Sequence, residues 1–328
     1  MIPGDTLLVS LVRLVDALPE PPKPPGKRGR GRTKTYSDRL FLKALVIMIV
    51  RQLHKVHELF SVLEQPTAEM QSLRTLLSEG GCYPSRRTFQ RRLAALPDTL
   101  PQPIGCLGRH LLALLQPWHD CGRAVAIDST VLRAKGGVWH KKDREAGIVP
   151  HTRIDTQAHW TKSGWHGWVY GWKLHLICTV ADVWIPLAAD LTPANEADNE
   201  KASPLIAALP GPPVFVLGDL HYNAPDVEEA CRCRGYTLVT TQYGPYPHAD
   251  AGVEVRRVFH KLRSAAIENF NEQFKGIFSA HDQVPTKGLV ATKRFALGAV
   301  LVYQIALLYR FEQGLPLRQG LKPFLRAA

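Results

Sequence analysis

The chain has 328 residues, of which 45% are apolar and 21% are charged. These proportions are typical of a soluble globular protein that can bury a core without disulfides or structural metal, and they exclude collagen-like, disulfide-scaffold and wholly disordered proteins. Lys and Arg number 41 and Asp and Glu number 29, which gives a net charge of +12. This surplus favours a polyanionic partner, either nucleic acid or an anionic membrane.

The six cysteines are scattered, without zinc-ribbon or Cys-x-x-Cys spacing, so we expect reduced thiols in a cytoplasmic protein. We also expect no signal peptide, because no basic flank precedes an apolar run at the N-terminus. The most apolar segment, 295–309, contains Gln304 and is shorter than the roughly 20 residues of a membrane span. It is predicted to be a buried core helix.

The first third of the chain is predicted to be helical and basic. An amphipathic helix within residues 1–18 precedes a linker at 19–35 that is rich in Pro, Gly, Lys and Arg, a composition that opposes folding. The linker could be a solvated spacer or an arm that lies along DNA phosphates. Residues 36–122 have apolar side chains at helical spacing, which predicts an all-helical region.

One basic helix in this region is a candidate for DNA binding. Ser85 is a plausible N-cap for it, and Phe89 and Leu93 fall on one apolar face. The pattern resembles the second helix of a helix-turn-helix, whose polar face enters the major groove. A solvated basic helix is the alternative. The polar face carries Arg86, Arg87, Gln90, Arg91 and Arg92.

Residues 123–312 are predicted to form one α/β domain, followed by a tail at 313–328. Three strands in a row and then alternating helices and strands indicate a mixed sheet with helices on its faces. Residues 136–170 show no clear period and are treated as an insertion. The expected strands are 124–127, 172–180, 184–191, 214–217 and 236–241, and the expected helices are 201–209, 224–234 and 259–278.

Two of the expected strands end in a carboxylate, at Asp128 and at Asp219. In open α/β sheets, ligands tend to bind beyond the strand ends. Mg²⁺ prefers oxygen ligands and keeps several waters, so one or two carboxylates can hold one ion. A third carboxylate would permit a pair of ions that stabilises both oxygens of an in-line phosphodiester displacement.

The third candidate carboxylate lies on the helix expected at 259–278. Ile267, Phe270, Phe274 and Ile277 form its core stripe, and Glu268, Glu272 and Lys275 fall at i, i+4 and i+7 on a neighbouring stripe. Either Glu268 faces the sheet end or this stripe is a solvated face.

Together these segments resemble the insertion-sequence transposases of the DDE type, whose catalytic domain is ribonuclease-H-like. The family typically shows a G-x-K-x-H … T-x-A-x-x-x-D stretch, then Asp shortly before Tyr, then Glu with Lys seven residues later. The order and spacing of the blocks carry the resemblance. The matching residues are Ala126–Ser129, then Gly171, Lys173, His175, Thr192, Ala194 and Asp198, then Leu217–Tyr222, then Glu268 and Lys275.

The resemblance implies that Asp128, Asp219 and Glu268 are the catalytic residues and hold two Mg²⁺ or Mn²⁺ ions, and that Lys275 contacts DNA phosphate. Glu272 is the fallback third ligand. The fuller family pattern has Tyr seven and Arg four residues before Glu, where this chain has Lys261 and Ser264. Arg263 is about 140° round the helix from Glu268, so the resemblance does not carry the Arg role onto it. Lys261 lies on the Glu268 face and could replace the missing cation at the DNA.

Five tryptophans and several cations fall between residues 139 and 173. Interleaved aromatic and basic side chains suit stacking on unpaired bases, and a flipped base is one such ligand. We therefore count Trp165, Trp168 and Lys173 among the DNA-binding candidates. The alternative is a compact subdomain that has the tryptophans as its core.

The expected function is cut-and-paste DNA transposition by a transposase that acts on double-stranded DNA, both the terminal inverted repeats and the target. From the resemblance we also expect a homodimer in the synaptic complex. The shortness of the apolar segment at 295–309 leads us to expect no membrane partner. The alternatives are a Mg²⁺-dependent nuclease that does not join strands, and a catalytically inactive DNA-binding regulator.

Overall fold

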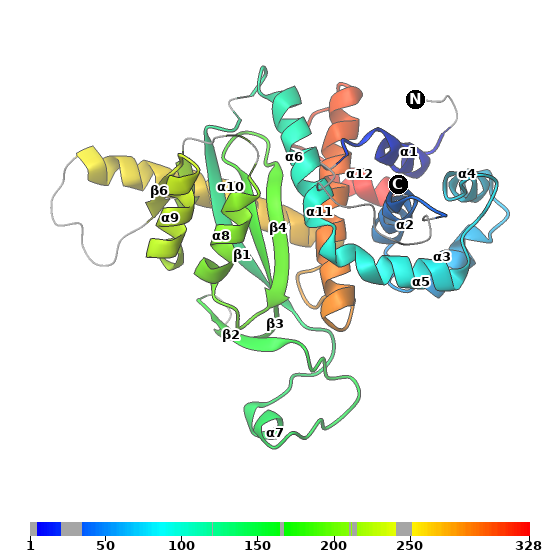
Figure 1. The fold of residues 1–328 in the computed structure, drawn as a ribbon, viewed down its shortest axis with the longest axis horizontal. Helices are drawn as coiled ribbons and strands as arrows, with labels where there is room; N and C mark the ends of the chain where they lie inside the picture. Colours follow the sequence, from blue (N-terminus) through cyan, green and yellow to red (C-terminus); the bar gives the residue numbers. More distant parts are fainter. Residues whose placement is uncertain are drawn as a thin grey trace, which may run out of the picture.

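The fold is taken from a computed structural model, which describes residues 5–20, 35–119, 121–164, 167–209, 211, 215–240 and 251–328, with side chains from 256 onward in the last range. Figure 1 shows a central sheet with helices on both faces and a cluster of N-terminal helices beside it. Most of the predicted linker at 19–35 lies outside the described residues.

The sheet is mixed, as predicted. In the order β2-β3-β1-β5-β6, β1 is antiparallel to β3 and parallel to β5, and β5 is parallel to β6. The fourth strand of the chain, β4, pairs antiparallel with β3 from Trp172 onward, whereas β2 pairs with the part of β3 before it. The strands are β1 (Ala124–Arg133), β2 (His159–Ser163), β3 (Gly167–Thr179), β4 (Pro186–Pro193), β5 (Phe215–Gly218) and β6 (Thr237–Thr240).

Two strands are longer than their sequence pattern predicts. The expectation that β1 ends at Asp128 is wrong, because β1 stays paired with β3 as far as Arg133. The first part of β3, from Gly167 to Gly171, is paired with β2, so both segments join the sheet out of the region treated as an insertion. Long-range backbone pairing therefore overrides the polar residues that seemed to end the first strand.

Gly171 explains why the family motif begins with glycine. A Cβ atom built at this position would lie 2.0 Å from the Leu132 carbonyl oxygen and 3.0 Å from the Ala134 nitrogen. Both are backbone atoms of the neighbouring segment, β1 and the residue after it, and cannot rotate away as a side chain could. Any side chain at this position would force β3 and β1 apart.

The two faces of the sheet are covered by different helices (Figure 1). The helices α8 (Asp198–Ala207) and α9 (Pro225–Cys233) pack together, and α8 lies against β3 and β4. The other face is covered by α6 (Pro101–Leu115), α10 (Ala251–Phe278) and α11 (Leu289–Glu312). Since side chains alternate along a strand, each strand of the sheet contributes to two separate layers.

The N-terminal helices begin at well-formed caps. Ser37, Thr67 and Ser85 each accept a backbone hydrogen bond at the start of a helix, which is the usual N-cap arrangement. The cap predicted at Ser85 is therefore confirmed, and Phe89 and Leu93 are buried as expected. The helices are α1 (Leu7–Ala17), α2 (Asp38–Val50), α3 (Val56–Leu63), α4 (Ala68–Leu76), α5 (Arg86–Ala95) and the 3₁₀ turn η1 (Leu96–Asp98).

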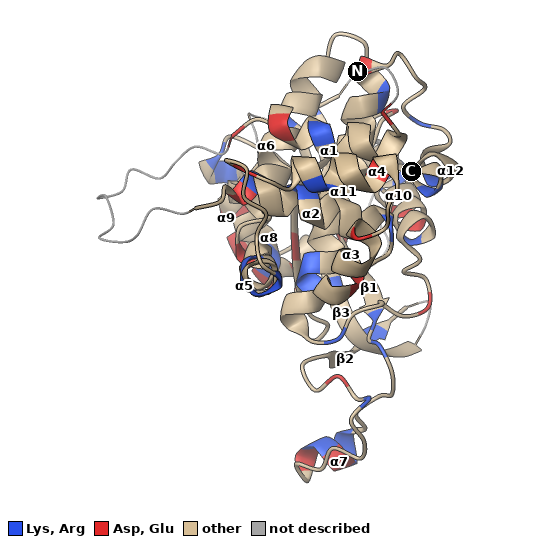
Figure 2. Cartoon of the chain, turned by 90° about the vertical axis from the view of Figure 1, so that its right-hand side faces the viewer, with Lys and Arg blue, Asp and Glu red and all other residues tan. Residues whose placement is uncertain are grey.

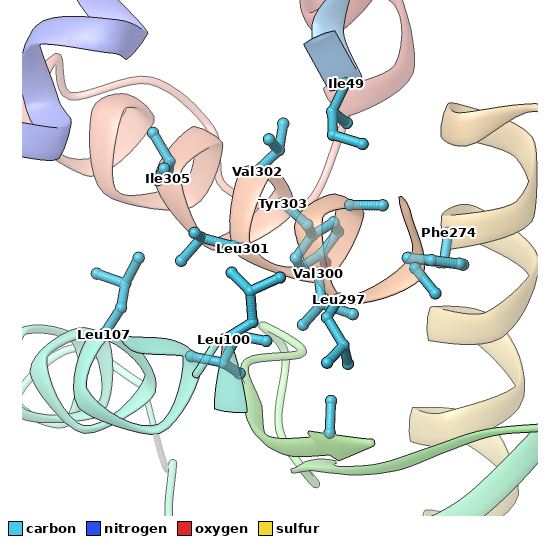
Figure 3. Packing of buried hydrophobic residues seen from close by; sticks show 14 of the residues in the cluster. Ile49, Leu100, Leu107, Phe274, Leu297, Val300, Leu301, Val302, Tyr303 and Ile305 are labelled. Carbon is cyan, nitrogen blue, oxygen red and sulfur yellow. The ribbon is translucent and has the colours of Figure 1, made fainter. Parts of the chain in front are cut away.

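Helix α11 lies at the centre of the protein. It contacts α1 and α2 on one side and α6 and β4 on the other. Figure 3 shows side chains of α11 pointing towards Leu107 of α6, Phe274 of α10 and Ile49 of α2. The helix is long and apolar enough to span a membrane, but most of it is buried within the protein. The core helix predicted at 295–309 is thus confirmed, and the short helix α12 (Leu321–Ala327) follows it.

The segment between β1 and β2 projects from the body of the protein, as Figures 1 and 2 show for the short helix α7 (Lys141–Glu145). Where the segment rejoins the sheet, Trp160 donates from its indole to the Trp139 carbonyl and its ring lies 5.3 Å from that of Tyr170. The tryptophans at this base are therefore packed structural residues, as the alternative reading of the insertion predicts.

Candidate active site

Asp128 and Asp219 lie side by side on neighbouring strands. The parallel register of β1 and β5 pairs Val125 with Val216 and Ala126 with Leu217. Asp128 and Asp219 each come two residues after the second pair, so they lie level with each other. Adjacent strands are about 4.8 Å apart. The two side chains also share a face of the sheet, because each is two residues beyond a paired residue.

The carboxylate of Asp128 is held on both sides. One oxygen accepts a 2.8 Å hydrogen bond from the Ser129 backbone nitrogen, and the other lies 3.3 Å from Nη1 of Arg263. Burial raises the pKa of Asp128 to about 6, the Arg263 guanidinium opposes this change, and the neighbouring Asp219 adds to it. Two like charges at one partly buried place are a reason for a cation to bind there.

Asp219 caps the short 3₁₀ turn η2 (Leu220–Tyr222). Its two carboxylate oxygens accept from the His221 backbone nitrogen at 2.9 Å and contact His221 Nδ1 at 3.1 Å. Tyr222 packs beneath this turn, so closely that a Cβ on Gly218 would lie 2.8 Å from the Tyr222 Cβ. The glycine before Asp219 thus allows the turn to fold back against the strand.

The hydroxyl of Tyr222 is buried, with no hydrogen-bond partner among the described residues. Burial raises its pKa, and the charges of Asp128, Asp198 and Asp219 act in the same direction. The buried hydroxyl of Tyr222 is therefore close enough to Asp128, Asp219 and Asp198 to be affected by all three charges.

A second polar cluster occupies the opposite face of the sheet, against α8. Lys173 Nζ lies 3.1 Å from Asp198 Oδ1, and His175 Nδ1 lies 3.6 Å from the same oxygen. His175 Nε2 is 2.8 Å from Thr192 Oγ1. These four residues are the Lys, His, Thr and Asp of the family motif, which the fold gathers into one buried network.

Lys173 is committed to this network. It also donates to the Glu196 carbonyl oxygen at 3.0 Å, and only 12% of its side chain is exposed. The DNA-binding role predicted for Lys173 has no support in this geometry, because the cation is already satisfied within the protein.

The sequence-predicted third carboxylate is not gathered with the aspartates. Glu268 is exposed on α10, about 140° round the helix and about 7.5 Å along its axis from Arg263, which is the residue that reaches Asp128. The fallback Glu272 is also exposed and lies 3.5 Å from His281 Nε2. Among the described residues, no three His, Cys, Asp or Glu side chains form a metal-binding group.

The chemistry of the aspartate pair nevertheless fits a divalent cation. Two carboxylates on one face, with like-charge repulsion between them, provide the oxygen ligands that suffice for one Mg²⁺ with waters. A second ion would need a third carboxylate, and in this structure Glu268 does not supply it.

Lys261 and Lys275 are also on α10, seven residues before and seven residues after Glu268. Lys275 is partly buried, which lowers its pKa, while Glu272 opposes and Arg133 reinforces that change. Lys261 is exposed. Lys275 and Arg133 place two cations near the end of β1, where an anion could bind.

Helix α5 carries a basic surface, visible in Figure 2. Arg86, Arg87, Gln90 and Arg91 are exposed. Arg92 is not free in the same way. Its guanidinium pairs with Asp38 and lies 4.4 Å from the centre of the Phe41 ring, so it fastens α5 to α2.

Of the two tryptophans proposed to stack on bases, Trp165 lies outside the described residues. Trp168 is 68% exposed on β3, which leaves its ring accessible to a planar ligand.

Arg263 is a site residue that the sequence motifs do not identify. It is 6% exposed and contacts Asp128. A signal for it was present, because Arg263 continues the core stripe of Ile267, Phe270, Phe274 and Ile277 at the spacing i, i+4, i+7, i+11 and i+14. A cation on the buried stripe of a helix requires a buried anion opposite it.

A family model described as "Transposase DDE domain" matches residues 119–305. No curated protein matches the chain. Among solved structures, a piggyBac transposase synaptic complex with hairpin DNA is similar with a TM-score of 0.39 and 11% identity, over 98% of this chain and 76% of that one. A Mos1 transposase paired-end complex with the left transposon end has a TM-score of 0.22 and 15% identity, over 94% and 92%. Both TM-scores are low, so the family match is the finding that bears on function.

Proposed function

We propose that this chain, which belongs to the transposase DDE domain family, is a DNA transposase that cuts the phosphodiester at the ends of a mobile element and joins the freed 3′-hydroxyl to target DNA. The family predicted from the sequence motifs is thereby confirmed. The observation that carries the finer proposal is the parallel register that sets Asp128 beside Asp219 within the matched segment.

In this proposal Asp128 and Asp219 hold a divalent cation, Mg²⁺ or Mn²⁺. When bound, such ions supply charge stabilisation to the attacking and leaving oxygens of an in-line displacement. The protein's own part is to aim the ligands. The Ser129 nitrogen fixes one oxygen of Asp128, and His221 fixes both oxygens of Asp219. No side chain needs to attack the phosphate, because the carboxylates act as ligands.

Glu268 is the third ligand that the resemblance implies, and with it a second ion. Its exposed position on α10 means that this role requires α10 to turn or shift when DNA and cations bind. Lys275 and Lys261 would then contact phosphates beside the reacting end, since both lie on the same side of the helix as Glu268.

The proposed DNA surface includes the exposed arginines of α5 and the ring of Trp168. Arg86, Arg87 and Arg91 would neutralise phosphates, and Trp168 would stack on an unpaired base. The net charge of +12 suits a polyanionic substrate. A homodimer that holds two element ends together is the assembly we propose.

The experiment uses DNA taken from the two sides of the coding frame, where the proposal places the ends of the element. We expect Asp219→Ala to abolish Mg²⁺-dependent cleavage and joining while binding of the ends persists. Asp226→Ala is the matched control, because Asp226 is an exposed acid on the neighbouring α9. Equal loss of binding and cleavage in Asp219→Ala would contradict the metal assignment.

Strand transfer with a pre-cleaved end separates a transposase from a nuclease. Joined products support the proposal, whereas cleavage without joining indicates the nuclease. If the wild-type protein binds DNA but neither cleaves nor joins it, the protein is a DNA-binding regulator. The exposed position of Glu268, away from the aspartate pair, is the observation that favours this alternative.

A further inference from the structure

Arg263 is a buried cation whose surroundings only partly satisfy it. The residue is 6% exposed. Its Nη1 lies 3.3 Å from Asp128 Oδ2, its Nη2 lies 3.5 Å from Ser264 Oγ, and its Nε has no hydrogen-bond partner among the described residues. One single-point contact is a loose arrangement for a guanidinium, which commonly binds a carboxylate through two parallel hydrogen bonds.

The contact also uses the oxygen that a divalent ion would need. The other oxygen of Asp128 already accepts from the Ser129 nitrogen. Asp219 is turned towards His221, so Arg263 is the cation that faces Asp128 in the described part of the site. A guanidinium and a divalent cation at one carboxylate repel each other electrostatically, so each weakens the binding of the other.

The helix geometry makes Arg263 a fixed part of the site. It sits on the buried stripe of α10, one turn before Ile267 and about two turns before Phe270, both of which are fully buried. In the protein without DNA its backbone is therefore held by core packing, while its long side chain can swing away from Asp128 by rotation about its own bonds.

We propose that Arg263 is a built-in counter-cation for Asp128, which occupies the carboxylate while no divalent ion is bound and is displaced when one binds. Arg263 thereby lowers the affinity of the site for free cations. This inference rests on the proposed function, because it assumes that Asp128 and Asp219 bind a divalent ion. Arg263 is a positioning residue in this account, since it acts through Asp128.

A consequence is that cation binding would be favoured when DNA is also present. A displaced guanidinium needs a new anionic partner, and a phosphate of the DNA backbone could provide it. The protein without DNA would then hold metal weakly, which restricts cleavage to the assembled complex.

The test measures the affinity of the full-length protein for Mn²⁺ alone, by isothermal titration calorimetry without DNA. Arg263→Met removes the charge and keeps much of the apolar stem. Since a divalent ion and a guanidinium about 6 Å apart repel strongly even at an effective dielectric constant of about 20, we expect the Mn²⁺ dissociation constant to fall at least tenfold.

Three further variants make the result specific. Arg263→Gln keeps polar reach without charge and should give the same tightening, so it replaces Arg263→Met if that variant does not fold. Lys142→Met removes an exposed cation on α7 and should leave the Mn²⁺ affinity unchanged. Asp219→Asn should weaken binding, which shows that the titrated ion is at this site.

Unchanged or weaker Mn²⁺ binding in both Arg263 variants would overturn the inference. If Mn²⁺ binds the wild-type protein and Asp219→Asn weakens it, that outcome leaves the proposed function standing. If the wild-type protein binds no Mn²⁺ at millimolar concentration and neither Arg263 variant does, the aspartate pair is not a cation site and the proposed function fails with it.

Discussion

The substitution His175→Gln would test the buried network behind the sheet. Burial lowers the pKa of His175 to about 4, while Asp198 and Asp190 oppose this change and Lys173 and Lys201 reinforce it. Because the pKa is about 6.5 in the unfolded chain, the unfolded state takes up a proton between about pH 6.5 and pH 4 that the folded state does not. The free energy of unfolding therefore falls as the pH falls through this window.

The expected size follows from the two pKa values. Between pH 7.5 and pH 5, this one imidazole should lower the free energy of unfolding by about 2 kcal/mol. His175 is 1% exposed, so solvent screening does not reduce this figure much. The variant does not titrate and can still donate a hydrogen bond to Thr192 Oγ1, so its own cost should depend little on pH.

The assay is urea unfolding of both proteins in EDTA, at pH 7.5 and at pH 5, with linear extrapolation to water. At pH 7.5 we expect the variant to be the less stable protein. At pH 5 the difference should shift by about 2 kcal/mol in favour of the variant. Titrating groups that do not interact with His175 cancel in this double difference. A difference that stays the same at both pH values would refute the reasoning.

Four other outcomes follow from the structure. Gly171→Ala should lower stability by more than about 2 kcal/mol, because its Cβ would meet the backbone of β1; a thermal unfolding midpoint equal to wild type would show that the strands can separate. Arg91→Ala should reduce the slope of log affinity against log salt for DNA by about 1, whereas Arg92→Ala should lower stability and leave that slope alone; equal effects on the slope would contradict the structural role of Arg92. Trp168→Ala should weaken binding to DNA with unpaired bases by about 1–3 kcal/mol, measured by fluorescence anisotropy, and an unchanged affinity would remove Trp168 from the DNA surface. A chain shortened to begin at residue 123 should aggregate on size-exclusion chromatography, since it exposes α11; a monodisperse folded product would argue against the shared core.

The aspartate pair could be predicted because the information is local. A short apolar run that ends in Asp is visible at 214–219, and the parallel pairing of β5 with β1 then brings Asp219 level with Asp128. The strand ends were harder to predict. Nothing near Asp128 shows that β1 continues, because the cause is its pairing with β3, which lies far later in the chain: Ser129 pairs with His175 and Arg133 with Gly171.

The third carboxylate shows the limit of reasoning from spacing. The stripe on α10 correctly identifies the buried residues, yet it does not say which end of the sheet each flank of the helix meets. The fold directs Arg263 to Asp128 and leaves Glu268 exposed. Motif spacing alone favoured Glu268, whereas the continuation of the core stripe would have favoured Arg263.

The central position of α11 has a mechanical consequence. Its side chains pack against both the N-terminal helices and the layer that covers the sheet. The two parts of the protein therefore share one hydrophobic core and are not joined by a hinge. Because α11 contacts both α5 and β4, we expect a displacement of α5 to reach the sheet that carries the aspartates.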